Sequence, residues 1–254
     1  MDLGLKGKKV ILTGGSRGIG RAALEIFAQE GCDVAFFSRN QEQVDKAVAE
    51  LSAHGAKVHA TAFDLLENSL EDYQAWLKNA AEALGGCDIF IPGASASGAG
   101  LTGDWDVCFK MDLMGAVRGT EALESYLEAS DCGSVVFMSS TAGVETFLVP
   151  QGYNSIKAAM LTYAGQLSQA WGPKGIRVNC ISPGPIEFQG GNWEAIKGAM
   201  PELYDATMPQ FALGRIGEPN DVARSLVFLA SPASAYTTGT NVVIDGGYTK
   251  RIQF

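Results

Sequence analysis

The chain has 254 residues, of which 46% are hydrophobic, and a formal net charge of −9 at pH 7. A chain of this length can bury a large core, and no composition break or Pro/Ser-rich linker divides it, so we expect a single domain over residues 1–254. The acidic excess, with no cluster of Lys and Arg, argues against binding to nucleic acid or to an anionic membrane.

The apolar runs, cysteines and histidines indicate where the protein is located and which kinds of site it lacks. No 18 apolar residues run together, and residues 1–6 lack the pattern of a signal peptide, so we expect no membrane span and a cytoplasmic protein. The five cysteines are scattered and odd in number, which favours reduced core residues over disulfides or a zinc site. Two histidines, His54 and His59, offer little for a His triad, and we expect no metal.

Short apolar runs alternate with helical patterns along the chain. Strands separated by helices of this length need right-handed crossovers and a parallel sheet. The sequence therefore predicts an α/β fold, a doubly wound parallel seven-stranded Rossmann sheet with helices on both faces. The expected strands cover residues 8–12, 33–37, 57–62, 88–91, 134–138, 177–181 and 241–245. The expected helices cover residues 21–30, 41–54, 68–84, 103–128, 153–171 and 220–229, with an irregular segment at 183–213.

The first strand leads into a glycine-rich turn, Thr13 to Gly20, and then into a helix. Glycines here permit tight backbone geometry, let the chain approach a pyrophosphate closely and aim helix N–H groups at the anion. The pattern predicts a dinucleotide site. The residues of this turn that we expect to contact the cofactor are Gly14, Ser16, Arg17, Gly18, Ile19 and Gly20.

Tyr153 and Lys157 stand four residues apart in a predicted helix, so their side chains share one face. A cation within about 4 to 6 Å favours the phenolate and brings the tyrosine pKa toward neutrality, which makes Tyr153 a plausible acid/base. Ser140 follows the buried strand 134–138, at the strand end where open parallel sheets bind ligands. Taken alone, a Tyr and a Lys at this spacing usually form a solvated helix face, and the glycine-rich turn is what favours the catalytic interpretation.

The two motifs, in this order, resemble those of the short-chain dehydrogenase/reductase family. Its TGxxxGxG turn and its Ser…Tyr-x-x-x-Lys set match at Thr13, Gly14, Gly18 and Gly20, and at Ser140, Tyr153 and Lys157. The resemblance covers essentially all of the chain and implies hydride transfer between a nicotinamide cofactor and a carbonyl or secondary alcohol. Ser140 would bind the carbonyl oxygen, Tyr153 would donate the proton, and Lys157 would lower the tyrosine pKa and grip the nicotinamide ribose.

The end of the second strand indicates which nicotinamide cofactor is used. An acidic residue there would bind the ribose 2′-hydroxyl of NAD and repel the 2′-phosphate of NADP. This chain has Ser38 followed by Arg39, and Arg17 lies in the glycine-rich turn, so two guanidinium groups can converge on one phosphate. The sequence therefore favours NADP(H), although Arg39 can also be a solvated residue that opens a helix.

The resemblance assigns further cofactor contacts outside the turn. Asp64 would meet the edge of the adenine ring, with Leu65 beside it, although Asp64 can equally cap a helix. Ala94 and its small neighbours would pass beside the cofactor. The residues after the sixth strand that would flank the nicotinamide are Pro183, Gly184 and Ile186.

Three departures from the family pattern stand out. Pro92–Ser95 replaces the common Asn-Asn-Ala-Gly, so the asparagine that braces neighbouring strands is absent. Phe188 replaces a hydroxyl residue, so that cofactor contact is lost or passes to the backbone. Asp112 aligns with an asparagine that holds a water leading to the lysine; the carboxylate can accept the same hydrogen bond, or it can pair with Lys157 and alter the proton relay. We include Asp112 among the candidate catalytic residues.

Together these features predict an NADP(H)-dependent oxidoreductase, similar to 3-oxoacyl thioester reductases. Segments 187–213 and 147–149 are rich in apolar residues, which implies a lid over an apolar or acyl-type substrate. The resemblance also implies a homotetramer, in which the helices bearing Asp112 and Tyr153 meet their symmetry mates and residues 241–254 close a second interface. The alternatives are a nucleotide-binding regulator of the same fold without turnover, an NAD-dependent dehydrogenase, and a dehydratase or epimerase that uses the same tyrosine.

Overall fold

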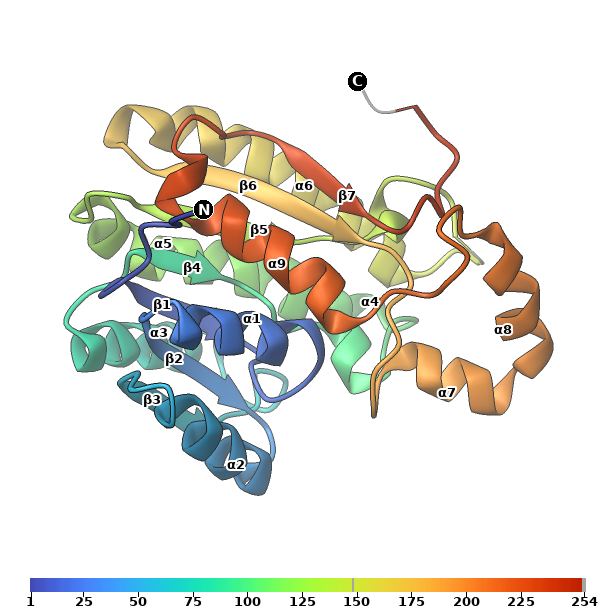
Figure 1. The fold of residues 1–254 in the computed structure, drawn as a ribbon, viewed down its shortest axis with the longest axis horizontal. Helices are drawn as coiled ribbons and strands as arrows, with labels where there is room; N and C mark the ends of the chain where they lie inside the picture. Colours follow the sequence, from blue (N-terminus) through green and yellow to red (C-terminus); the bar gives the residue numbers. More distant parts are fainter. Residues whose placement is uncertain (148, 253–254) are drawn as a thin grey trace.

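The computed structural model describes residues 1–147 and 149–252 and confirms the doubly wound α/β architecture (Figure 1). Seven parallel strands form one sheet in the order β3-β2-β1-β4-β5-β6-β7. Their bounds are β1 Lys9–Thr13, β2 Asp33–Ser38, β3 Val58–Ala62, β4 Ile89–Ile91, β5 Ser134–Met138, β6 Arg177–Pro183 and β7 Asn241–Ile244. The expected strands are all present, and the order reverses beside β1, where such sheets bind their ligands.

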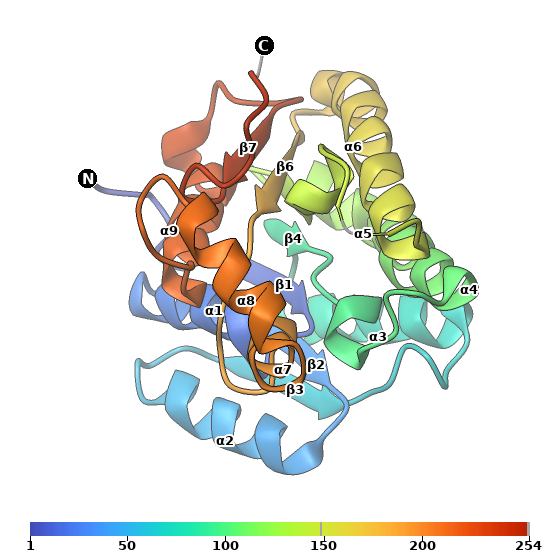
Figure 2. The same ribbon diagram turned by 90° about the vertical axis from the view of Figure 1, so that its right-hand side faces the viewer.

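Helices cover both faces of the sheet, as Figure 2 shows. One face carries α1 (Gly18–Gln29), α2 (Gln41–Ser52) and α9 (Pro219–Ala230), and the other carries α3 (Leu70–Leu84), α5 (Gly115–Glu128) and α6 (Gly152–Trp171). Neighbouring residues of β1 alternate between the two cores: Ile11 packs in one and Leu12 in the other, both fully buried. The central strands are apolar throughout because neither face meets water.

The predicted helix 103–128 is divided by a wider turn. It consists of α4 (Trp105–Cys108), the π-helical segment η2 (Phe109–Met114) and α5. Asp104 caps its start by accepting the Val107 N–H at 3.0 Å. The hydrophobic pattern of the sequence does not reveal one extra residue in a single helical turn, so this wider turn was not predicted. π-Helical turns are frequent at functional sites. Asp112 lies within this one.

The segment 183–213, which the sequence predicts to be irregular, contains two helices. These are α7 (Asn192–Ala199) and α8 (Pro201–Thr207), followed by a short turn, η5 (Met208–Gln210). They lie beyond the carboxyl ends of the strands, at the right in Figure 1 and nearest the viewer in Figure 2. The prediction was wrong because Pro201 looks like a helix breaker, yet it is tolerated at the first position of a helix.

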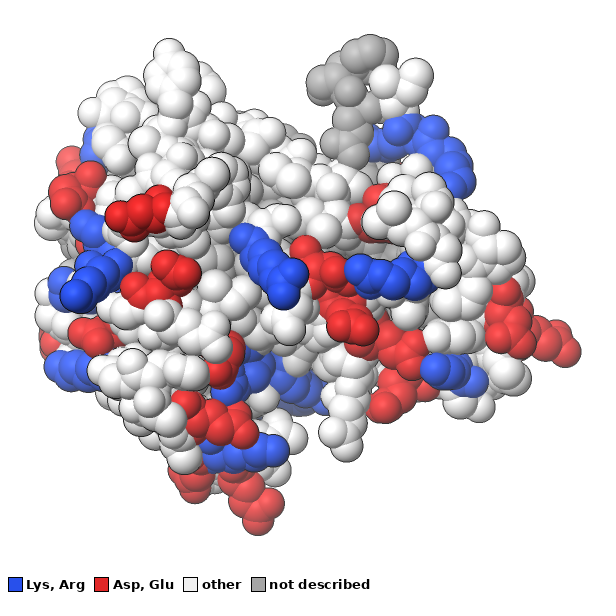
Figure 3. Space-filling view, in the orientation of Figure 1, with Lys and Arg blue, Asp and Glu red and all other residues white. Residues whose placement is uncertain are grey.

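Short turns and a mixed surface complete the fold. The remaining 3-10 turns are η1 (Ala96–Ala99), η3 (Thr141–Gly143), η4 (Gly172–Lys174) and η6 (Pro232–Ser234). On the face in Figure 3, basic and acidic side chains intermingle. Lys197 and Arg215 form surface ion pairs with Glu187 and Asp221. Among the helices of residues 1–147 and 149–252, none is both long and apolar enough to cross a membrane.

Candidate active site

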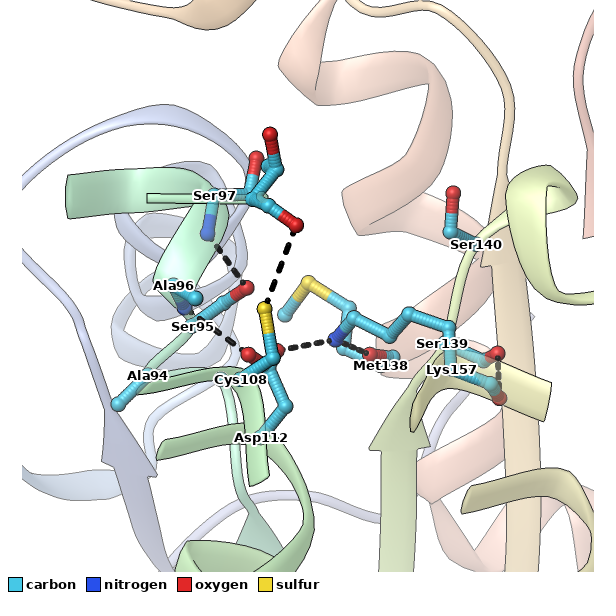
Figure 4. A network of polar contacts seen from close by, with 12 residues as sticks. Ala94, Ser95, Ala96, Ser97, Cys108, Asp112, Met138, Ser139, Ser140 and Lys157 are labelled. Carbon is cyan, nitrogen blue, oxygen red and sulfur yellow. Dashed lines mark hydrogen bonds and ion pairs between the residues drawn. The ribbon is translucent and has the colours of Figure 1, made fainter. Parts of the chain in front are cut away.

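The structure brings the four candidate catalytic residues together at the carboxyl ends of β4 and β5. Ser140 lies two residues after β5, Tyr153 and Lys157 lie in the first turns of α6, and Asp112 comes from η2. Figure 4 shows Asp112 and Lys157 pointing toward one another, with Ser140 on the adjacent loop. Residues from distant parts of the chain meet here because parallel strands share one carboxyl edge.

Lys157 is buried, with a side chain that is 4% exposed. Its Nζ donates to the carbonyl of Met138 at 2.7 Å, lies 2.9 Å from Oδ1 of Asp112 and stands 5.4 Å from the ring centroid of Tyr153. Burial lowers the pKa of the lysine, but the Asp112 carboxylate and the tyrosine oppose this, so the net pKa of Lys157 is raised. Lys157 therefore carries its charge at neutral pH.

Tyr153 departs from the sequence expectation. Burial raises its pKa, the Lys157 ammonium lowers it and the Asp112 carboxylate raises it again, while hydrogen bonding to the Ser140 and Ser97 hydroxyls lowers it. The net pKa of Tyr153 is raised above its ordinary value, whereas the sequence predicted a shift toward neutrality. That prediction was wrong because burial of the phenol outweighs the effect of the lysine, and the Asp112 carboxylate acts in the same direction as burial.

Asp112 contacts Lys157 directly, which was one of the two possible roles expected from the sequence. Its carboxylate is 1% exposed: Oδ1 faces the lysine, and Oδ2 accepts the N–H of Ala96 in η1 at 3.0 Å. A buried carboxylate needs such partners, because desolvation of an unpaired charge is costly. The charge of Asp112 is therefore coupled to that of Lys157 and, through it, to the tyrosine.

Ser140 and Thr13 organise the backbone around this centre. The Ser140 Oγ accepts the N–H of Ala142 at 3.2 Å, which fixes the hydroxyl at the start of η3. The Thr13 Oγ1 accepts the N–H groups of Gly93 and Ala94 at 3.0 and 3.1 Å. Thr13 thereby connects β1 to the loop after β4, where the bracing asparagine of the family is missing, and it holds Ala94 beside the glycine-rich turn.

The glycine-rich turn has positions that require glycine. Gly14 and Gly18 have φ of +80° and +58°, in the left-handed region. A Cβ on Gly20 would lie 2.5 Å from the carbonyl oxygen of Gly14, so a side chain there would force the turn apart. Helix α1 begins at Gly18, and Ile19 lies in its first turn, so free N–H groups of the helix start at this turn. The backbone fits a bound pyrophosphate.

Two arginines meet at the end of β2. Arg17 and Arg39 both donate through Nη2 to the carbonyl oxygen of Gly98, Arg39 at 3.0 Å. The hydroxyls of Ser16 and Ser38 lie 2.6 Å apart beside them. Two guanidinium groups that converge on one oxygen have the geometry that a phosphate monoester requires, so these residues fit a 2′-phosphate.

The other predicted cofactor residues lie along the same edge. Asp64 accepts the N–H of Leu66 at 2.9 Å and so caps the turn after β3, whereas α3 is capped by Ser69. Leu65 is buried. Pro183 ends β6, Gly184 donates to the Ile244 carbonyl of β7 at 2.9 Å, and Ile186 is buried in a bridge to Gly217.

Phe188 has a role that the sequence did not reveal. A Cβ added to Gly18 would lie 2.7 Å from the Phe188 ring, so the aromatic side chain covers the start of α1. The sequence indicated only a lost hydroxyl contact at this position. No motif pointed to Ser97 and Asn192 either, although the Asn192 Nδ2 donates to the Ser97 Oγ at 2.8 Å across the site.

A cavity of about 150 Å³ begins at Thr141, the residue after Ser140. Most of its lining side chains carry hydroxyl, amide or charged groups, and they come from three parts of the chain: Thr141, Glu145, Thr146 and Phe147; Gln210; and Tyr248, Thr249 and Lys250. The ring of Phe147 lies 6.5 Å from that of Trp193, and the rings of Trp193 and Tyr204 are also 6.5 Å apart. These aromatic contacts connect one wall of the cavity to the segment 187–213, for which an apolar lid stays a prediction; Leu148 lies outside the described residues.

A cluster of metal-ligand types lies away from this site. Asp88, Asp131 and Cys132 have ligand atoms within 4.8 Å of one another. Asp88 already accepts from the backbone of Lys9, and Asp131 pairs with Lys8, so the acids have protein partners. Within the described residues the five cysteines are free thiols, and four are buried.

Comparison with known proteins places these features in a family context. Residues 14–249 match the family profile described as Enoyl-(Acyl carrier protein) reductase. The chain is 39% identical over 259 residues to isoepoxydon dehydrogenase patN of Penicillium expansum, covering 100% of this chain and 99% of that one. It is 34% identical to the NADP-dependent mannitol dehydrogenase of Hypocrea jecorina, over 97% of this chain and 94% of that one. The L-sorbose reductase of Gluconobacter frateurii, solved with NADPH and L-sorbose, superposes with a TM-score of 0.87 at 27% identity, over 99% and 100% of the two chains.

Proposed function

The chain belongs to the short-chain dehydrogenase/reductase family, and on this basis we propose that it is an NADP(H)-dependent oxidoreductase that interconverts a carbonyl and a secondary alcohol. The observation that carries the proposal is the buried arrangement of Lys157 beside Tyr153, with Ser140 on the adjacent loop and the glycine-rich turn at the same sheet edge. A regulator without turnover would not need a buried lysine beside the tyrosine.

In the reducing direction, the cofactor supplies the hydride to the carbonyl carbon. The Ser140 hydroxyl binds the carbonyl oxygen, and Tyr153 donates its proton to the alkoxide that develops there. Because the pKa of Tyr153 is raised, the proton is present at neutral pH and leaves only when a stronger base forms. The Lys157 ammonium then stabilises the phenolate.

The preference for NADP(H) rests on the two arginines. Arg17 and Arg39 converge on one oxygen acceptor, and β2 ends at Ser38, where an acid would repel a 2′-phosphate. Two relatives, an NADP-dependent mannitol dehydrogenase and a sorbose reductase solved with NADPH, support the same choice. NAD(H) is the alternative cofactor, and comparing the reaction rates with NADPH and NADH in the same assay decides between the two.

For the substrate, we propose a small carbonyl compound with further oxygen functions. The wall of the cavity next to Ser140 presents Thr141, Glu145 and Thr249, which can hydrogen-bond hydroxyl groups. Burying an acyl chain against these groups would cost their hydration without replacing it. The acyl-type substrate that the sequence favours stays a prediction, supported by the aromatic contacts of Trp193.

The assay is loss of nicotinamide absorbance with a panel that contains a ketose, a small hydroxyketone and a 3-oxoacyl thioester. We expect NADPH oxidation with an oxygenated ketone. Binding of NADPH without turnover of any ketone would instead favour the regulator, and substrate conversion without net cofactor oxidation would favour an epimerase or dehydratase.

We also propose a homotetramer that works in the cytoplasm. β7 is an edge strand of the sheet, and a hollow of about 460 Å³ beside it is lined by Phe228, Leu229 and Val242. Phe228 and Tyr236 are exposed near this edge, which a second copy would cover. Residues 253–254 of the predicted tail interface lie outside the described residues. Light scattering that gives a monomer at micromolar concentration would refute the tetramer, and cell fractionation tests the location.

A further inference from the structure

The insert that carries α7 is joined to η1 by a side-chain hydrogen bond. The Nδ2 of Asn192, the first residue of α7, donates to the Oγ of Ser97 in η1 at 2.8 Å. Arg17 donates through Nη1 to the carbonyl of Gly190 at 2.9 Å and through Nη2 to the carbonyl of Gly98. The insert, η1 and the glycine-rich turn are therefore held together.

The inner side of η1 contacts the active-site lysine through Asp112, as Figure 4 shows. Ala96, next to Ser97, donates its N–H to Oδ2 of Asp112 at 3.0 Å, and Oδ1 of the same carboxylate lies 2.9 Å from the Nζ of Lys157. Ser95 accepts the N–H of Ser97 at 3.2 Å, which ties the turn together. A short chain of hydrogen bonds and one ion pair thus connects the insert to the lysine.

We propose that the Asn192–Ser97 contact is a positioning device, which sets how strongly the buried carboxylate holds Lys157. Closure of the insert over the cofactor would then adjust the proton-donating group. This inference rests on the proposed function, because it assigns a further role to the same site. Asn192 acts here through other residues and is a positioning residue, whereas the Ser97 hydroxyl also hydrogen-bonds Tyr153 directly.

The physical basis is competition for one carboxylate. A donor N–H stabilises part of the charge of Asp112, so with Ala96 in place the carboxylate holds its ammonium partner less tightly. When η1 withdraws, Lys157 becomes the main partner of the anion. A more fully neutralised lysine stabilises the Tyr153 phenolate less, and the tyrosine loses its proton less readily.

The other ionisable groups near Lys157 do not titrate in the same range. They are the thiols of Cys108 from α4 and Cys180 from β6. Burial raises the pKa of Cys108 to about 11, and burial raises that of Cys180 to about 12. Both thiols therefore stay neutral around pH 7, and Asp112 and Tyr153 are the partners that the device affects.

The test is the pH dependence of kcat/KM for ketone reduction with saturating NADPH in Asn192→Ala, which removes the contact to Ser97 and leaves the Ser97 hydroxyl in place. We expect a raised apparent pKa of the acid/base group and a kcat/KM about 2- to 10-fold lower, the effect of one net hydrogen bond. Ser97→Thr keeps the hydroxyl and should leave both values as in the wild type. Glu202→Gln, an exposed position in α8, is the matched control in the insert and should change neither.

Asn192→Ala is then made in the Asp112→Asn background, where the amide carries no charge and the shift should disappear. An equal shift in both backgrounds, or a lower rate with an unmoved pH profile, would overturn the proposal. If the Asp112→Asn protein does not fold, the comparison of Asn192→Ala with the wild type decides alone: equal apparent pKa values would refute the device.

A second readout separates this inference from the proposed function. The 13Cζ signal of Tyr153, assigned by its loss in Tyr153→Phe, reports the tyrosine pKa in the NADPH-bound protein without any substrate. A wild-type protein that reduces no ketone refutes the proposed function. A 13Cζ titration that is the same in wild type and Asn192→Ala refutes the positioning device.

Discussion

Asp112→Asn tests the buried ion pair directly, because the amide keeps the shape of the carboxylate and removes its charge. The two side chains are 1% and 4% exposed, and Oδ1 of Asp112 lies 2.9 Å from the Nζ of Lys157. In the variant the ammonium keeps the Met138 carbonyl but loses its anion. Removing one partner of a buried ion pair lowers the free energy of unfolding by about 3 to 5 kcal/mol. Because the Met138 carbonyl still accepts from the ammonium, we expect a loss at the lower end, about 3 kcal/mol.

Thermal and urea unfolding measure this loss. For a chain of this length, about 3 kcal/mol corresponds to a fall in Tm of about 6 to 12 °C. Because the pKa of Lys157 is raised in the folded protein, its stabilising contribution is present below its ordinary pKa of 10.5 and is lost as the pH rises through the raised value. The difference between wild type and variant should therefore shrink at alkaline pH.

Lys157→Met in the Asp112→Asn background is the control, since it removes the unpaired charge. The double variant should recover part of the lost unfolding free energy, because a buried ion pair can be replaced by apolar packing at little cost. An unchanged unfolding free energy for Asp112→Asn at neutral pH would contradict the argument. So would a double variant that is less stable than the single one.

Three further predictions concern the chemistry. Tyr153→Phe should lower kcat by about 10²- to 10⁴-fold and leave NADPH affinity unchanged, and a variant that kept more than about a third of the rate in a chemistry-limited step would rule out Tyr153 as the acid. Arg39→Ala should weaken NADPH binding by roughly 10- to 100-fold and barely change NADH binding. Arg118→Ala on α5 is the control and should change neither affinity. Equal affinity of the wild type for both cofactors would contradict the predicted preference for NADPH. Because the pKa of Tyr153 is raised, ketone reduction should be fast at neutral pH while alcohol oxidation rises as the pH approaches that pKa, and an oxidation rate that does not depend on pH would argue against this proton donor.

The parts of the fold that the sequence predicts well are those governed by burial. Ile11 and Phe90 lie in strands covered on both faces, so continuous apolar runs mark them. Helices α7 and α8 were missed because α7 buries no residue completely and Pro201 imitates a break. The π-helical turn around Asp112 was missed because one additional residue leaves the hydrophobic pattern of the helix almost unchanged.

The site shows a similar division. Local spacing identifies Tyr153 and Lys157, since four residues on a helix fix their relation. Contacts between loops leave no such pattern, so the donation from Ala96 to Asp112 and from Asn192 to Ser97 appears only in the folded chain. The cavity beside Thr141 was missed for the same reason, because three separate parts of the chain supply its wall.

These unpredicted contacts change the chemistry expected of the predicted residues. From spacing alone, the ammonium of Lys157 should lower the tyrosine pKa, and Tyr153 would then serve equally as acid and base near neutrality. In the folded chain, burial of the phenol raises that pKa, the Asp112 carboxylate raises it further, and the tyrosine keeps its proton at neutral pH. A phenol that retains its proton at neutral pH is suited to donating it to an alkoxide and poorly suited to removing one from an alcohol. We therefore expect carbonyl reduction to be faster than alcohol oxidation at neutral pH, and the rates of the two directions measured across the pH range test this.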